Sequence, residues 1–251
     1  MKIALRIHQR RQFKYLTMSN NNQLTIAGYI RRIHSVITRA LDVAIEHTSL
    51  FTETKSQDIF SLGFINYVQS LLSLLHSHHL LEDERIFPYL QTKLADVPFE
   101  LMEAQHQEML LVLDEIELQL TSIEKNRLCS PKALIAFNQQ LVRLREIWHP
   151  HMQTEEEYIN DTQLGTIIDP EEQKEQSEAF AHYTASYIDA DCLVMPFILY
   201  NLPPEDRATM SQVFPPIVSQ QLIPIDWRSQ WESMLPFFVE GIESQMAASP
   251  Q

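Results

Sequence analysis

The sequence predicts an all-α protein. Its 251 residues include only four glycines and no long run of β-branched residues, and they are rich in Leu, Gln, Glu and Met, which favour helices. Along four stretches, apolar residues also recur every three or four positions, which is the spacing of one face of a helix. With 45% apolar residues, the chain can bury a substantial core and fold on its own.

The first two amphipathic stretches carry ionisable residues on their apolar faces. Residues 26–44 predict a helix whose apolar face includes His34, and residues 64–82 predict a second whose face ends in His78 and Glu82. The apolar positions of these faces are Ile26, Ile30, Ile37, Leu41 and Ala44 in the first helix, and Phe64, Val68, Leu71 and Leu75 in the second.

The third and fourth stretches repeat this arrangement. Residues 99–120 predict a helix with His106 on its apolar face, and Ser130 followed by Pro131 is a typical helix start for the fourth. The fourth face carries His151 and Glu155. The apolar positions are Phe99, Met102, Met109, Leu113, Ile116 and Leu120 in the third helix, and Leu134, Phe137, Leu141, Leu144, Trp148 and Tyr158 in the fourth.

The ionisable residues on these faces form two matching sets, each a lone histidine followed by His-x-x-x-Glu. The sets are His34, His78 and Glu82, and His106, His151 and Glu155. The step from the lone to the paired histidine is 44 positions in the first set and 45 in the second. Residues four apart share a helical face, so four imidazoles and two carboxylates should converge. Such a group of ligands favours two bridged transition-metal ions.

Two other interpretations of these residues must be weighed. Two buried glutamates without partners would cost roughly several kcal/mol each, so they require either cations or a dense hydrogen-bond network. The other pattern is Glu-x-x-His, typical of ferritin-like carboxylate sites, at Glu103 to His106 and Glu146 to His149. It is disfavoured because its two helices would be consecutive and because Glu103 and His149 lie off the apolar faces.

Charge is unevenly distributed along the chain. Residues 1–41 hold eight Lys or Arg and no acid, which leaves 11 basic and 33 acidic residues in the rest. This acidity argues against nucleic-acid binding by the body of the protein. Residues 1–22 are predicted to be a basic, flexible N-terminal segment, and both Met1 and Met18 are candidate start residues.

Several features predict a cytoplasmic protein that does not enter membranes. The opening residues have no sustained apolar core of the kind found in a secretory signal. The longest apolar run, at 192–202, is too short to span a bilayer and is interrupted by Pro196. Cys129 and Cys192 provide no disulfide framework and fit a reducing compartment.

Two segments of the chain resemble the hemerythrin-like, or HHE cation-binding, domain. HHLLEDERIFPYL at 78–90 is similar to that family's His-His-x-x-Glu-Glu followed by Leu-Phe-Pro. HMQTEEEYI at 151–159 resembles its second His-x-x-x-Glu-Glu element. The resemblance covers about residues 24–162.

This resemblance implies an antiparallel four-helix bundle over residues 23–165, enclosing a non-haem centre of two iron ions. The implied ligands are Glu82 and Glu155 as bridges, His34 and His78 on one iron, and His106 and His151 on the other.

The chain also departs from the family pattern. Oxygen-carrying hemerythrins have a fifth histidine four residues before the position of His106, where this chain has Met102. His79 is a candidate additional metal ligand, since an adjacent residue plays that role in some iron-sensing members. Pro150 removes a helical hydrogen bond and predicts a kink before His151.

Residues 166–251 predict a further helical segment that packs on the bundle. Asp169 and Pro170 form a helix start, and the amphipathic pattern continues to about Tyr187. We expect the following helices to cover the open end of the bundle and to bury Trp227, Trp231 and Phe237.

Two functions are compatible with these predictions. The first is a protein that binds or senses a small diatomic ligand such as oxygen or nitric oxide, or iron itself. The alternative is a diiron redox enzyme that acts on nitric oxide or peroxide, or that delivers iron for repair. Binding or sensing is favoured over an enzyme because the sequence shows no flavin or Fe–S module that would supply electrons.

Overall fold

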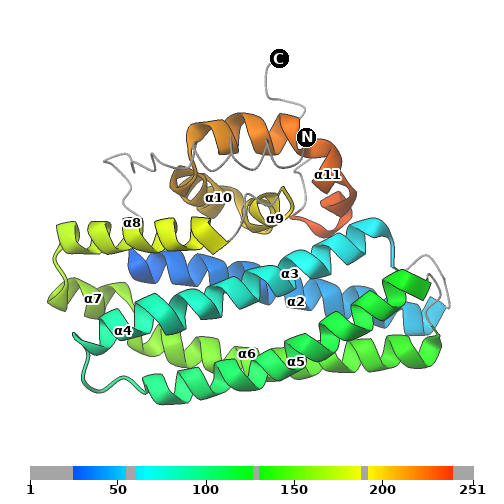
Figure 1. The fold of residues 1–251 in the computed structure, drawn as a ribbon, viewed down its shortest axis with the longest axis horizontal. Helices are drawn as coiled ribbons and strands as arrows, with labels where there is room; N and C mark the ends of the chain where they lie inside the picture. Colours follow the sequence, from blue (N-terminus) through cyan, green and yellow to red (C-terminus); the bar gives the residue numbers. More distant parts are fainter. Residues whose placement is uncertain (1–24, 55–59, 127–129, 188–191, 240–251) are drawn as a thin grey trace.

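The computed structural model describes residues 25–54, 60–126, 130–187 and 192–239, and these residues are helical without any strand. The all-α prediction is therefore confirmed (Figure 1). The segment 1–22, predicted to be basic and flexible, lies outside the described residues. None of the described helices is both long and apolar enough to cross a bilayer.

Four long helices lie side by side (Figure 1). They are α2 (Ile26–Thr54), α3 (Leu62–Leu81), α5 (Phe99–Asn126) and α6 (Pro131–Tyr158). α2 and α5 each pack against both α3 and α6. α2 and α6 run in opposite directions, because His34 contacts Glu156 whereas Ser49 contacts Asn138.

The starts of two long helices follow from local side-chain chemistry. The Ser61 hydroxyl accepts a hydrogen bond from the Phe64 amide at the start of α3. Ser130 does the same for Ala133 at the start of α6, with Pro131 as the first helical residue, as predicted. α6 continues through Pro150 from Pro131 to Tyr158, and the kink predicted before His151 stays a prediction.

An irregular turn follows His78 and His79 at the end of α3. Residues Glu82–Ile86 form a π-helical turn, η2, followed by the short helix α4 (Phe87–Gln91). Pro88 has no amide hydrogen, and its ring would collide with the carbonyl of Glu84 in a regular α-helix. The wider turn avoids that collision, and π-helical turns are frequent at functional sites.

Two helices, α7 (Asp161–Ile167) and α8 (Pro170–Tyr187), follow α6 at one end of the long helices. The Asp169 carboxylate accepts hydrogen bonds from the Glu171 and Glu172 amides, which confirms the predicted start of α8. α8 packs against α3 and α2.

The remaining elements form the C-terminal part of the chain. They are α9 (Val194–Tyr200), α10 (Pro204–Met210), the 3-10 turn η3 (Ser211–Val213), the π-helical segment η4 (Val218–Asp226), α11 (Arg228–Trp231) and the 3-10 turn η5 (Glu232–Phe237). Trp227, Trp231 and Phe237 are buried among them, as expected. The boundary between residues 165 and 166 stays a prediction.

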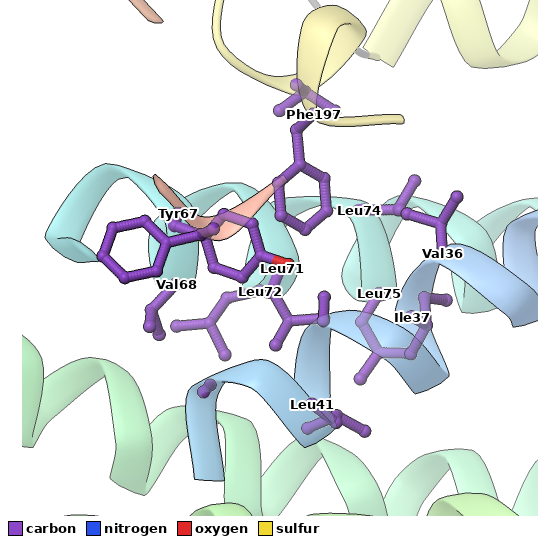
Figure 2. Close-up of a cluster of buried hydrophobic side chains, with 14 of the residues drawn as sticks. Val36, Ile37, Leu41, Tyr67, Val68, Leu71, Leu72, Leu74, Leu75 and Phe197 are labelled. Carbon is purple, nitrogen blue, oxygen red and sulfur yellow. The ribbon is translucent and has the colours of Figure 1, made fainter. Parts of the chain in front are cut away.

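The C-terminal elements lie along the flank of α3 rather than across an end of the long helices (Figure 1). The physical reason is that α3 is apolar on two faces. Val68 and Leu75 belong to the apolar face predicted from the sequence, whereas Tyr67 points in another direction and contacts Phe197 of α9, with ring centroids 4.9 Å apart (Figure 2). A helix that is apolar over more than half of its circumference needs cover on two sides.

A polar network anchors the C-terminal part to α2 and α3. The Arg39 guanidinium donates hydrogen bonds to the Tyr67 hydroxyl, the Asn201 side-chain oxygen and the Phe237 carbonyl. The Tyr67 hydroxyl also donates to Asn201 at 2.7 Å. Asn201 is buried, so this network satisfies polar groups that would otherwise be costly inside the protein.

We predict that Gly63→Ala destabilises the protein by about 1–3 kcal/mol, as overpacking does. A Cβ atom at Gly63 would lie 1.8 Å from the carbonyl oxygen of Ser233, so α3 and η5 would have to separate. Urea unfolding measures the change.

Gly165→Ala is the matched control, because a Cβ atom there meets nothing within 4 Å and Gly165 lies inside α7. This control should gain about 0.5–1 kcal/mol from the better helix propensity of alanine. Equal stability of the two variants would contradict the close packing of η5 on α3.

Candidate metal centre

Every ligand predicted from the two His-x-x-x-Glu sets lies inside the four long helices or at the start of η2. The side chains of His34, His78, Glu82, His106, His151 and Glu155 are all at most 3% exposed. Each lies on the apolar face from which it was predicted, so these faces converge on a single buried region.

The structure brings these six side chains together in two neighbouring groups, and His79 joins them. One group is His34, His78, Glu82 and Glu155; the other is His79, Glu82, His106 and His151. Within each group, one potential ligand atom of every residue lies within 4.8 Å of the others. We call these seven side chains the buried centre. Glu82 belongs to both groups.

Both carboxylates lie between the two groups of histidines. Glu82 approaches His78 with one oxygen, at 3.1 Å from Nε2, and His106 with the other, at 3.5 Å. Glu155 Oε2 lies 3.0 Å from Nε2 of His34 and 3.5 Å from Nε2 of His151. Each carboxylate therefore faces one histidine of each group, which is the position that a bridging ligand occupies.

Glu82 and Glu155 have no hydrogen-bond partner on any carboxylate oxygen among the described residues, and neither do Nε2 of His34 nor either ring nitrogen of His78. These atoms lie near one another but are not aligned as donors and acceptors. Unsatisfied buried polar atoms are costly. So many unsatisfied polar atoms at one place indicate that hydrogen bonds among these side chains do not account for the buried centre.

The histidines are oriented by polar groups outside the two groups. Nδ1 of His34 is hydrogen-bonded to Glu156 at 2.9 Å, and Nδ1 of His106 to Asp83 at 2.7 Å. Nδ1 of His151 is 3.2 Å from the side-chain oxygen of Gln105. A carboxylate or amide on the far nitrogen holds the imidazole in one tautomer, with Nε2 free to bind a metal.

In two of these contacts, an acidic residue next to one sequence set contacts a histidine of the other set. Asp83 follows the glutamate of the first set and contacts the lone histidine of the second, His106. Glu156 follows the glutamate of the second set and contacts the lone histidine of the first, His34. The sequence analysis did not assign roles to Asp83, Glu156 or Gln105. The available signal was the acidic residue directly after each glutamate.

Apolar rings enclose the buried centre. Trp148 is fully buried, with its ring centroid 5.2 Å from that of His34 and 5.8 Å from that of His151. Its indole nitrogen donates a hydrogen bond to Thr38 and therefore faces away from the ligands. Phe87 stacks on His106 with a centroid separation of 5.5 Å. These rings exclude water from the centre.

His79 stacks on His106 with ring centroids 4.0 Å apart. The helical period alone places it beside the apolar face of α3, but it is only 7% exposed in the structure. Its position next to His106 places His79 in the group that contains His106 and His151. His149, by contrast, is half-buried and belongs to neither group.

Burial keeps three of the histidines neutral in the metal-free protein. Desolvation, together with the neighbouring imidazoles, holds the pKa of His78 and of His79 well below the ordinary 6.5. Desolvation also lowers the pKa of His151 to about 4, although the Glu155 charge opposes the shift. A neutral imidazole is the form that binds metal.

The pKa values of His34, Glu82 and Glu155 depend on burial and on the charges of their neighbours. Burial opposes the charged form of His34, but the carboxylates of Glu155 and Glu156 outweigh this and raise its pKa. Burial and the charge of Glu155 raise the pKa of Glu82 well above 4.5. Burial also disfavours the charge on Glu155, yet His34 and the other histidines lower its pKa. Without metal, these shifts favour the protonated form of Glu82 and the charged form of His34 beside Glu155.

The family model described as the hemerythrin HHE cation binding domain matches residues 25–161, more than half of the chain. The match includes the four long helices and all seven side chains of the buried centre. No curated protein and no solved structure gives a significant match.

We predict that the metal-free protein is most stable near pH 6.5. Below that pH the unfolded chain takes up protons at His78, His79 and His151 that the folded protein does not, so stability rises with pH. Folded Glu82 above pH 4.5, and folded His34 above pH 6.5, hold protons that the unfolded chain has lost. Their contributions to stability fall as the pH rises through their raised pKa values, and above pH 6.5 no rise from the other histidines offsets this fall. Melting temperatures between about pH 5 and 8.5 test this.

Glu82→Gln is the control for this pH dependence. It removes one proton-holding group, so the fall above pH 6.5 should flatten and the rise below it should become steeper. A melting temperature that climbs steadily to pH 8.5 in the metal-free wild-type protein would contradict the assigned protonation states.

Proposed function

Because the chain belongs to the hemerythrin HHE cation-binding domain family, we propose that it is a non-haem diiron protein that binds or senses a small ligand such as oxygen or nitric oxide, or iron itself. The observation that carries the proposal is the buried centre, in which five imidazoles and two carboxylates meet in an apolar interior. We also propose that the four long helices are the antiparallel bundle of this family.

The donor set fits transition-metal ions. Imidazole nitrogen and carboxylate oxygen together suit iron and its neighbours, whereas calcium and magnesium take sets of oxygen ligands. The two carboxylates also supply the negative charge that cations would balance. Bound cations would in turn satisfy the carboxylate oxygens that lack hydrogen bonds.

The proposed roles follow the two groups. Glu82 and Glu155 would bridge, because each lies between one histidine of each group. His34 and His78 would hold one ion. The other ion would be held by His106 and His151, with His79 as an additional ligand.

The unequal histidine count matters for ligand binding. The group with His34 has two imidazoles and the group with His79 has three, so the first ion would keep more positions for an outside ligand. When bound, the ions would supply those open positions to oxygen, nitric oxide or a related small molecule. Trp148 and Phe87 would keep competing water away.

The alternative is a redox enzyme that uses the same open positions on nitric oxide or peroxide, or in iron delivery for repair. It would need electrons from a separate donor. Turnover of nitric oxide or peroxide by the iron-loaded protein under a supplied reductant would favour the enzyme. Reversible ligand binding without turnover would favour a binding protein or sensor.

We predict about two iron ions per chain in the wild-type protein, and close to none in Glu82→Ala or Glu155→Ala, because loss of a bridge removes a ligand from both ions. His149→Ala should retain the wild-type content, since His149 lies outside both groups. Metal analysis of folded protein after expression with added iron is the measurement. Iron-free wild-type protein, or iron lost from His149→Ala alone, would overturn the assignment.

We predict that Asp83→Ala and Glu156→Ala each weaken iron binding by about 10–100-fold, as loss of a residue that orients a ligating histidine typically does. Asp83 holds His106 and Glu156 holds His34. Glu157→Ala removes the same charge from the next, exposed position of α6 and should change little. Competition with a chelator of known affinity measures all three. Equal affinities would mean that these carboxylates do not orient the ligands.

A further inference from the structure

A second cluster of potential metal ligands lies outside the buried centre. It consists of His76 on α3 and Asp114 and Glu117 on α5, with one potential ligand atom of each residue within 4.8 Å of the others. His76 is half-buried, and both carboxylates are exposed. We call these three residues the outer cluster.

Contacts with other side chains do not account for the closeness of the three residues of the outer cluster. Among the described residues, none of its members has a hydrogen bond or ion pair, although two like charges lie one helical turn apart at Asp114 and Glu117. α5 as a whole holds seven acidic residues against the single Lys125, so no nearby lysine or arginine of that helix offsets them. A cation would remove this repulsion.

Packing fixes the backbone positions of the outer cluster. Leu75, next to His76, is fully buried, as is Ile116, next to Glu117, and Leu113, next to Asp114, is 1% exposed. α3 and α5 pack directly against each other at this level. The cluster is therefore held by two rigid helices rather than by a loop, which favours a defined ligand geometry.

The outer cluster lies one helical turn along α3 from the buried centre. His76 precedes His79 by three residues on α3, so the two imidazoles belong to adjacent turns of one helical face. His79 is 7% exposed, against at most 3% for the other four imidazoles of the centre. Along α5, Asp114 is eight residues from His106, or about 12 Å.

We propose that His76, Asp114 and Glu117 form an exposed site for a divalent transition-metal ion, and that this site captures ions on their way to the buried centre. The capture role rests on the proposed diiron function; the binding itself does not. One imidazole with two carboxylates selects first-row transition ions over calcium or magnesium. Only three protein ligands and open solvent leave the ion exchangeable, and the acidic surface raises the local cation concentration.

The binding is tested with Zn²⁺ as the probe, by equilibrium dialysis of the purified full chain and metal analysis. Asp114→Asn with Glu117→Gln should bind one Zn²⁺ per chain fewer than Glu108→Gln with Glu115→Gln. The second pair removes two exposed charges from the same helix and leaves the outer cluster intact. His76→Asn should also lose that ion.

Equal zinc content in the two double variants would overturn the site, because binding would then depend only on net charge. Retention of the ion by His76→Asn would overturn the assignment of the imidazole. The comparison is made between variants of equal charge, so it holds whatever metal the buried centre contains. Melting curves verify that each variant is folded.

The capture role is tested by loading metal-free protein with Fe²⁺ without oxygen, and measuring tightly held iron after rapid desalting at successive times. Loading should be several-fold slower in Asp114→Asn with Glu117→Gln than in the control pair, with the same final content. Equal rates would overturn the capture role. If the wild-type chain held no iron at any time, the diiron proposal would fail, while the zinc difference would still decide the outer site.

Discussion

The burial of Glu82 and Glu155 is the constraint on which the rest of the structure depends. Two carboxylates without solvent contact repel each other and lose their hydration, so the surrounding groups must compensate. In the metal-free protein the compensation is partial, because the raised pKa values of Glu82 and His34 favour a proton on Glu82 and a charged His34 beside Glu155. The centre also divides the apolar interior into two clusters of buried side chains.

The same polar contacts that orient the histidines also hold the helices in place. Glu156 of α6 reaches His34 of α2, and Asp83 in η2 reaches His106 of α5. The first pair joins two neighbouring long helices, and the second joins η2, which follows α3, to α5. The geometry of the centre and the packing of the helices therefore depend on one another. The π-helical turn before Pro88 contains both Glu82 and Asp83, so the carboxylate proposed as a bridge and the carboxylate that contacts His106 lie on consecutive residues.

The C-terminal part of the chain covers apolar surface of α3 that the other long helices leave exposed. α3 is apolar on the face toward α2 and also on the face with Gly63 and Tyr67. The outer face is covered by α9 and η5, where Gly63 allows the Ser233 carbonyl to approach. Together these faces leave α3 only a narrow polar side, with Asn66, Gln69 and Ser73, and this pattern can be read from the sequence. That pattern would have predicted cover along α3 rather than at the end of the bundle.

The sequence by itself determined the helical class, the starts of α6 and α8, and the six residues of the two matching sets. These features follow from local rules, because helical period and capping depend on residues within a few positions of each other. The tertiary structure decided that His79 joins the centre, since its stacking on His106 depends on the distance between α3 and α5. It likewise decided that Asp83 contacts His106 and that Glu156 contacts His34. Contacts between helices far apart in sequence have no local period, so only the packed fold determines them.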